Sequence, residues 1–205
     1  MHIAIIGTGN VGGTLARKWA EKGHQIYLGV QNKDNFKGKE LENLSGIEVH
    51  SVAEAVALSE VVVLATPAMA AVEVAKSLGP VEGKILIDTM NIVMGRGPAG
   101  FNNTSDAIIA HTGASDVVKC FNTTGFNNMA NPVYGDRKLD MFVAGDSAKA
   151  KAAATQLALD AGFGQCYDVG GNDKFFLMEQ FAFFWINLAM MQGQGREIGF
   201  ALLKR

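Results

Sequence analysis

Short runs of apolar residues alternate along this chain with segments of helical periodicity. The runs are bounded by glycine, proline or polar turns, so they predict strands. The predicted strands span residues 3–6, 24–30, 47–50, 60–66, 84–89, 116–121, 140–145 and 164–169. Nearly continuous apolar strands are typical of a parallel sheet that helices cover on both faces. We therefore expect an α/β fold of the Rossmann type, with a doubly wound, mainly parallel sheet.

The predicted helices fill the gaps between the strands. One helix follows the first strand directly, and others cover residues 52–58, 68–78 and 147–161. A single long helix covers residues 172–191. This last helix carries apolar residues around nearly its whole circumference, which in a globular protein indicates burial on all sides. One sheet covers only one side of a helix, so we expect a second copy of the chain to cover the other.

The turn after the first strand carries a glycine motif. Gly7, Gly9 and Gly12 have the G-x-G-x-x-G spacing between a strand and a helical pattern. In a dinucleotide-binding turn the first glycine permits the tight turn and the second lets a pyrophosphate approach the backbone. The third lets the helix lie close to the sheet. The free N–H groups and positive dipole end of the helix then form an anion site, here without any lysine. Residues 1–170 are therefore expected to form an NAD(P)-binding domain, and residues 171–205 a C-terminal helical segment for dimerisation and pocket formation.

The end of the second strand predicts the choice of cofactor. An acidic residue there binds the ribose 2′-hydroxyl of NAD, whereas polar or basic groups accept the 2′-phosphate of NADP. Here the strand ends in Gln31, Asn32 and Lys33, and the first acid, Asp34, comes later. This favours NADP(H), although the arginine usual at this position is missing. The alternative is a solvated turn.

Polar residues follow three further strands, whose carboxyl ends should line the crevice of the sheet. Thr66 is expected near the nicotinamide ribose, and Asn91 near the nicotinamide itself. Asp88 lies beside them, but it and Asn91 have an equally good alternative role, which is to cap and fix the following loop. Asn122 begins a polar segment bordered by aromatic residues, which suits the floor of a pocket for a flat ring.

Composition and charge exclude several classes. The 205 residues have a net charge of −2, a pI near 6.1 and no basic run, which argues against nucleic acid as a partner. Cys120 and Cys166 are isolated in apolar runs and are expected in the core. No charged leader or cleavable apolar segment precedes the first strand, so we expect a cytoplasmic protein. Residues 175–191 come nearest to a membrane span, but polar residues such as Glu179 interrupt them.

No catalytic side chain stands out. The four histidines lack metal-ligand spacing, and no Ser-His-Asp or Cys-His arrangement is evident, so neither a metal nor a catalytic residue is assigned. Lys174 or Asp173, near the start of the last helix, would suit a proton donor of a dehydrogenase. A solvated charge at a helix end is the commoner role of such a lysine.

The whole chain resembles the NADP-dependent deazaflavin oxidoreductases, the NADPH:coenzyme F420 reductase family, to which the cytosolic domains of the STEAP metalloreductases are related. The resemblance rests on segments that occur in the same order. They are Ile5-Ile-Gly-Thr-Gly-Asn-Val-Gly12, Val62-Val-Leu-Ala-Thr-Pro67, Leu86-Ile-Asp-Thr-Met-Asn91, Val117-Val-Lys-Cys-Phe-Asn-Thr123, Ala144-Gly-Asp146 and Gly193-Gln-Gly-Arg196.

This resemblance implies a homodimer that transfers hydride between NADP(H) and a flavin-like ring. It places Thr8, Asn10 and Val11 with Gly7 and Gly9 in the pyrophosphate turn. From their places at the strand ends, Pro67 beside Thr66 is also assigned to the cofactor site, and Thr123 beside Asn122 to the substrate site. Gln31 and Asn32 stand where family members usually have serine and arginine.

Three functions remain open from the sequence. The first is an NADPH-dependent reductase of a deazaflavin, flavin or similar flat acceptor. Its ring would lie between the Asn91 and Asn122 loops and the 175–185 helix. Such a transfer needs alignment of two rings rather than a catalytic triad. The second is a dehydrogenase or imine reductase that uses Lys174 or Asp173. The third is a dimeric sensor that binds NADP(H) without turnover.

Overall fold

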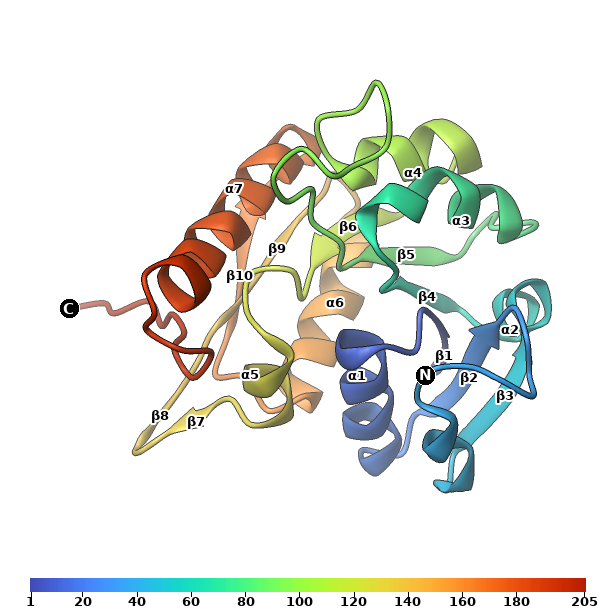
Figure 1. Ribbon diagram of the computed structural model, residues 1–205, viewed down its shortest axis with the longest axis horizontal. Helices are drawn as coiled ribbons and strands as arrows, with labels where there is room; N and C mark the ends of the chain where they lie inside the picture. The colour runs from blue at the N-terminus through green and yellow to red at the C-terminus, as the bar shows by residue number, and fades with distance from the viewer.

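The computed structural model describes all 205 residues and contains the predicted eight-stranded sheet (Figure 1). The strand order is β3-β2-β1-β4-β5-β6-β9-β10. Its first six strands have the order of a doubly wound nucleotide-binding sheet, so the predicted fold class is confirmed. These strands are β1 (His2–Ile6), β2 (Gln25–Val30), β3 (Ile47–Ser51), β4 (Val61–Leu64), β5 (Ile85–Asp88) and β6 (Val117–Cys120), followed by β9 (Met141–Ala144) and β10 (Cys166–Gly170).

The last two strands of the sheet, β9 and β10, run antiparallel to the other six. β9 pairs antiparallel with β6, and β10 pairs parallel with β9, whereas all pairs from β3 to β6 are parallel. Residues 126–139 make the reversal, with the short helix α5 (Phe126–Ala130) and a hairpin of β7 (Val133–Tyr134) and β8 (Arg137–Lys138). The sequence pattern predicts neither element, because each is too short to show a period. Gly170 therefore ends β10 at the amino edge of the parallel strands.

The predicted helices are all present. They are α1 (Asn10–Glu21), α2 (Val52–Leu58), α3 (Ala71–Ser77) after the 3₁₀ turn η2 (Ala68–Ala70), α6 (Ala148–Asp160) and α7 (Phe175–Ile186). A 3₁₀ turn, η3 (Asn172–Lys174), precedes α7, and the π-helical turn η4 (Asn187–Met191) follows it. The 3₁₀ turn η1 (Lys39–Asn43) and the helix α4 (Thr104–Thr112) are additional.

The period of two along each strand builds a core on each side of the sheet. On β1, Ile3 and Ile5 pack with residues of α1 and α6, while Ala4 and Ile6 pack with residues of α2 and α3. The indole of Trp19 on α1 is fully buried and donates to the Leu157 carbonyl of α6 over 2.9 Å. Both faces are thus covered, as the continuous apolar strands predict.

A buried ion cluster joins the sheet to α7. The ammonium of Lys119 on β6 lies 2.6 Å from Asp88 Oδ2 at the end of β5 and 2.9 Å from Glu179 Oε1 on α7. All three side chains are buried. The Glu179 carboxylate also accepts hydrogen bonds from the backbone N–H groups of Ile92 and Thr104 at 2.8 and 2.9 Å. The cluster therefore fixes β5, β6, α7, the start of α4 and the loop after β5.

Within this chain α7 buries only one face, and cover of its other face by a second copy stays a prediction. Its buried positions follow the three- and four-residue spacing of a helix face: Phe175, Met178, Glu179, Ala182 and Trp185. On the opposite face Phe176, Leu177 and Phe184 are each about half exposed, at 51, 52 and 51%. The sequence indicated an apolar circumference, and it did not indicate that Glu179 would form an ion pair with a buried lysine.

Two smaller expectations concern the cysteines and the membrane. Cys120 is buried and Cys166 partly buried, and both thiols are free. Burial raises the pKa of Cys120, which keeps its thiol protonated. None of the helices combines the length and the apolar character that crossing a membrane requires.

The ion cluster predicts an asymmetric response to substitution. Lys119→Met should lower the free energy of unfolding by about 3–5 kcal/mol, because it leaves two buried carboxylates without their cation. Lys76 serves as a control, since its exposed ion pair with Glu73 spans 3.7 Å, and Lys76→Met should change stability by no more than about 0.5 kcal/mol. Urea denaturation measures both. Equal midpoints for Lys119→Met and the parent protein would contradict the role of the cluster.

Candidate functional site

The turn from β1 to α1 has the geometry that its glycines predict. Gly7 has a φ of +101°, and a Cβ there would lie 2.6 Å from the Ala65 carbonyl group after β4. A Cβ on Gly12 would lie 1.9 Å from the Gly7 carbonyl oxygen. Neither position accommodates a side chain, so the glycines let the helix and two strand ends meet closely.

Gly9 differs from these two glycines because the space beside it is open. A Cβ built there meets nothing closer than Lys37 Cδ at 3.9 Å. Gly9 is the N-cap of α1, and no side chain caps the helix. The first N–H groups of α1 therefore remain available to an anion, as the sequence predicts.

A cavity of about 370 Å³ lies at the carboxyl ends of β1, β2 and β4. β1 and β4 are neighbours in the sheet, and the strand order reverses between them. This reversal is where open α/β sheets bind nucleotides. Six of the predicted cofactor residues line the cavity, together with Asn35, Phe36 and Val74: Gly7, Thr8, Gln31, Asn32, Thr66 and Pro67. Gly9 and Asn10 line a second cavity beside it.

The residues after β2 divide into two groups. Gln31 and Asn32 line the cavity, and the Asn32 side chain accepts the Asp34 N–H at 2.9 Å. Lys33 turns away, because its ammonium binds Glu54 on α2 at 3.0 Å. The Ser51 N–H and then Lys33 lower the pKa of the Glu54 carboxyl to about 2, so the carboxylate persists as the partner of Lys33. The structure thus gives no support to Lys33 as a phosphate donor.

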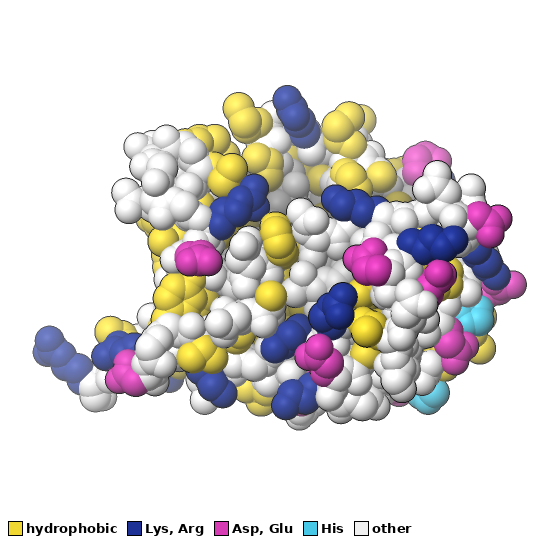
Figure 2. Space-filling model, turned by 60° about the horizontal axis from the view of Figure 1, so that its bottom comes forward, with side chains coloured by type: hydrophobic (Ala, Val, Ile, Leu, Met, Phe, Trp, Pro, Cys, Tyr) yellow, Lys and Arg dark blue, Asp and Glu magenta, His cyan; other side chains and the backbone are white.

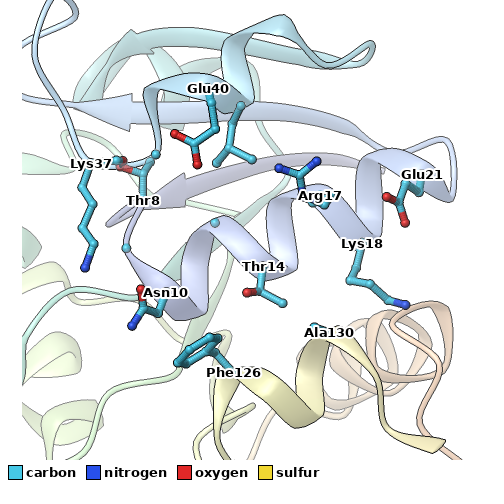
Figure 3. Close-up of a pocket in the computed structure, with 14 residues that line it drawn as sticks. Thr8, Asn10, Thr14, Arg17, Lys18, Glu21, Lys37, Glu40, Phe126 and Ala130 are labelled. Atoms are coloured by element: carbon cyan, nitrogen blue, oxygen red, sulfur yellow. The ribbon is translucent and has the colours of Figure 1, made fainter.

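Lys37 is the cation that sequence reasoning missed. The Thr8 hydroxyl donates to the Lys37 carbonyl, which folds the loop after β2 over the glycine turn. The Lys37 ammonium then lies 4.0 Å from the Cβ position of Gly9 (Figure 3). The expected anion site without a lysine therefore has one at its edge. Lys37 lies seven residues beyond the end of β2, in a loop without periodicity, so no sequence signal marked it.

Asn91 and Asn122 meet at the ends of β5 and β6. The Asn91 amide donates to the Asn122 carbonyl at 2.8 Å, and the Asn122 amide donates to Asn91 Oδ1 at 2.9 Å and to the Met178 carbonyl at 3.1 Å. The Asn122 side chain is buried, yet its Oδ1 has no hydrogen-bond donor. Phe121 precedes it with a φ of +59°. A buried acceptor without a donor, beside a strained residue, is typical of a functional site.

Four other predicted positions contact neighbouring residues of the fold. Asp88 is fully buried in the ion cluster, so its alternative role of fixing the following loop is the one the structure shows. Thr123 is buried, and Val11 is half-buried against the core. Neither lines the cavities at the glycine turn. The Thr66 hydroxyl donates to Met90 Sδ at 3.3 Å.

A smaller cavity of about 220 Å³ lies between the loop after β5 and α7. It is lined by Ile92 and Met94 from the loop and by Phe176, Glu179 and Phe183 from the helix, among others. These side chains come from the loop and the helix between which the sequence predicts the flat acceptor.

Lys174 and Asp173 line none of these cavities. They pair with each other in η3, directly after β10. Because β10 is antiparallel to β6, this segment lies near the start of β6. There the Gly145 N–H donates to the Gly170 carbonyl, and Gly145 lies beside Val117. The predicted cofactor residues lie at the opposite edge of the sheet. No group of three or more His, Cys, Asp or Glu side chains could hold a metal ion.

Comparison with known proteins shows what this arrangement resembles. Residues 2–92 match the family model described as NADP oxidoreductase, coenzyme F420-dependent. Over the full length of both chains, the structure matches an Arthrobacter sp. FB24 protein to which F420-dependent NADP reductase activity has been ascribed, with 26% identity and a TM-score of 0.86. A Sinorhizobium meliloti protein of unassigned function shares the fold at 20% identity and a TM-score of 0.72, over 100% of this chain and 96% of that one.

Imine reductases share the fold but are longer. The Streptomyces aurantiacus enzyme has 17% identity and a TM-score of 0.68, and the match covers 93% of this chain and 63% of that chain. The relation to the STEAP metalloreductases stays a prediction. The resemblance to the coenzyme F420-dependent NADP oxidoreductases that the sequence indicates is confirmed, by the family model over residues 2–92 and by the fold over the whole chain.

Proposed function

We propose that this protein is an NADP(H)-dependent oxidoreductase that transfers hydride between nicotinamide and a deazaflavin, flavin or similar flat acceptor. The observation that carries the proposal is the set of polar groups at the carboxyl edge of the parallel strands. It comprises the 370 Å³ cavity at the strand-order reversal, the open glycine turn beside it and the buried acceptor atom of Asn122.

The pyrophosphate of the cofactor fits at Gly9. The open space there admits a phosphate, the uncapped N–H groups of α1 donate to it, and the Lys37 ammonium adds a positive charge nearby. The adenosine half then occupies the cavity, with its ribose toward Gln31 and Asn32. No carboxylate lines this cavity to repel a 2′-phosphate, which favours NADP over NAD.

The nicotinamide half extends toward Asn91 and Asn122. The carboxamide N–H₂ of a nicotinamide would supply the donor that Asn122 Oδ1 lacks. The Asn91–Asn122 pair and the Met178 carbonyl fix the orientation of this side chain, so the acceptor atom is preorganised. When bound, NADPH supplies the hydride, and the proton that completes reduction of the acceptor comes from water.

The acceptor ring is assigned to the region between the loop after β5 and α7. Phe176 and Phe183 provide apolar surfaces there, which suit a flat ring. The residues of this chain position the two rings and exclude water, and no acid–base triad is required. The position of Lys174 and Asp173 at the opposite sheet edge gives no support to a dehydrogenase that uses them.

We also propose that the active form is a homodimer. The half-exposed Phe176, Leu177 and Phe184 on α7 form an apolar surface together with Met190 and Met191, which are 53 and 47% exposed. Large apolar side chains left exposed on one helix face favour an interface. Because Phe176 also lines the 220 Å³ cavity, a second copy on this face would wall the acceptor site.

Hydride transfer is tested by adding deazaflavin or flavin to NADPH-loaded protein and following NADPH absorbance. We expect oxidation of NADPH coupled to reduction of the added ring. Gly9→Ala should lose both NADPH binding and turnover without loss of thermal stability, since the added methyl group enters the pyrophosphate space but touches no backbone. Binding of NADPH without oxidation by any flat acceptor would favour the sensor, and full affinity in Gly9→Ala would contradict the site.

A matched set of substitutions distinguishes the residues that contact the pyrophosphate from those that contact the 2′-phosphate. Lys37→Ala should weaken NADPH and NADH alike, by roughly 1–3 kcal/mol, because it removes charge from the pyrophosphate site. Lys33→Ala is its control and should change neither affinity, because Lys33 pairs with Glu54. Gln31→Ala with Asn32→Ala should weaken NADPH alone. Calorimetry measures each, and equal affinities of the parent protein for NADPH and NADH would refute the assigned preference.

The dimer is tested by light scattering at micromolar concentration. The expected mass is about twice the 21.8 kDa of the chain. Phe176→Glu with Phe184→Glu should yield a folded monomer, because both side chains are half exposed in the single chain and their replacement charges the interface. A monomeric parent protein would contradict the proposed homodimer.

A further inference from the structure

The ion cluster of Asp88, Lys119 and Glu179 contains one more anion than cation. Three donors lie 2.6 Å from Asp88 Oδ2: the Lys119 ammonium and the hydroxyl groups of Thr104 and Ser105. Glu179 accepts from the same ammonium and from two backbone N–H groups. Hydrogen bonds donated to a carboxylate favour its charged form. With both carboxylates ionised around one ammonium, the cluster holds one surplus negative charge.

The cluster binds the backbone on both sides of Asn91. The Met90 N–H donates to Asp88 Oδ1 at 2.9 Å, and the Met90 carbonyl accepts the lysine ammonium at 2.9 Å. The Ile92 N–H donates to Glu179 Oε2 at 2.8 Å. Asn91, toward which the nicotinamide is assigned, therefore lies between two residues that the cluster holds in place.

Asn122 is linked to the same cluster. Its side-chain amide donates at 3.1 Å to the carbonyl of Met178, the residue before Glu179. Asn122 also follows Lys119 by three residues at the end of β6. Its Oδ1, which lacks a donor, is thus held within a few residues of the surplus charge. A buried charge acts on its neighbours with less screening than a charge in water.

The two cavities assigned to the cofactor and the acceptor have one charged wall residue between them. Glu179 is the only charged residue that lines the 220 Å³ cavity, and no charged residue lines the 370 Å³ cavity. Lys37 lies at Gly9, beside the assigned pyrophosphate, which is the same in both redox states of the cofactor. On the face shown in Figure 2, acidic and basic side chains are mixed, so neither sign dominates that surface. Solvent and salt screen such exposed charges.

We propose that the surplus negative charge of the ion cluster stabilises the oxidised, positively charged nicotinamide ring and so favours hydride transfer from NADPH to the acceptor. The inference rests on the proposed function. In this transfer the C4–H bond of the dihydronicotinamide breaks, and the hydrogen leaves with both electrons for the acceptor ring, which takes a proton from water. The nicotinamide ring gains one positive charge, which a fixed negative charge attracts. Asp88 and Glu179 are thus positioning residues that also set the local potential.

NADP⁺ and NADPH provide a matched pair of probes, because they differ by one hydride and therefore by one positive charge on the ring. Calorimetry on the full chain gives both Kd values. Glu179→Gln should lower the ratio of the NADPH Kd to the NADP⁺ Kd by roughly fivefold, the order expected for one partly screened charge. Asp88→Asn removes the same charge from the other carboxylate and should lower the ratio in the same direction. Glu73→Gln, at a side chain that is 80% exposed, is the control and should keep it.

Adenosine 2′,5′-bisphosphate separates the charge from a structural role, because it lacks the nicotinamide. Its affinity should be the same in Glu179→Gln and in the parent protein. An equal loss of affinity for this fragment and for NADP⁺ would make the cluster merely structural and overturn the inference. Melting temperatures identify any variant that does not fold. If neither variant folds, the parent protein decides, because it must bind NADP⁺ more tightly than NADPH.

The outcomes distinguish this inference from the proposed function. An unchanged Kd ratio in the folded variants would overturn the electrostatic role and leave the oxidoreductase intact. A parent protein that binds neither NADP⁺ nor NADPH would overturn the proposed function and this inference together.

Discussion

The buried contact of Lys119 with Asp88 and Glu179 is the constraint on which the rest of this structure depends. A lysine in the centre of a sheet is stable only if its charge is paired and its three protons are bound. Here the two carboxylates and the Met90 carbonyl meet that need. Because Glu179 belongs to α7 and Asp88 to β5, satisfying the lysine also docks the C-terminal helix on the nucleotide-binding sheet.

The antiparallel orientation of β9 and β10 determines the direction in which α7 runs along the sheet. α7 begins near the amino edge of the parallel strands and runs back toward their carboxyl ends. Phe175 thus packs on Ala144 at the end of β9, and the Trp185 ring contacts Gly125 beyond β6. The aromatic residues of α7 consequently arrive at the edge where the cofactor is assigned. A parallel continuation of the sheet would have started α7 at that edge and carried its aromatic residues away from it.

The glycine turn separates two surfaces with different chemistry. On one side, the cavity at the ends of β1, β2 and β4 is lined by amide, hydroxyl and apolar groups and lies where open α/β sheets bind nucleotides. On the other, the second cavity beside Gly9 runs along α1, and its lining includes the charged residues Arg17, Lys18, Glu21, Lys37 and Glu40. Lys37 stands between them at Gly9.

The sequence by itself determined the eight strands, the mainly parallel α/β fold and the glycine turn, because these follow from local periodicity and backbone freedom at single positions. It also placed Gln31, Thr66 and Asn122 at the carboxyl ends of strands. Only the tertiary structure decided the direction of β9, the pairing of Glu179 with Lys119, the diversion of Lys33 to Glu54 and the approach of Lys37 to Gly9. Each of these depends on which distant charge or strand a residue meets, and no period along the chain records such a contact.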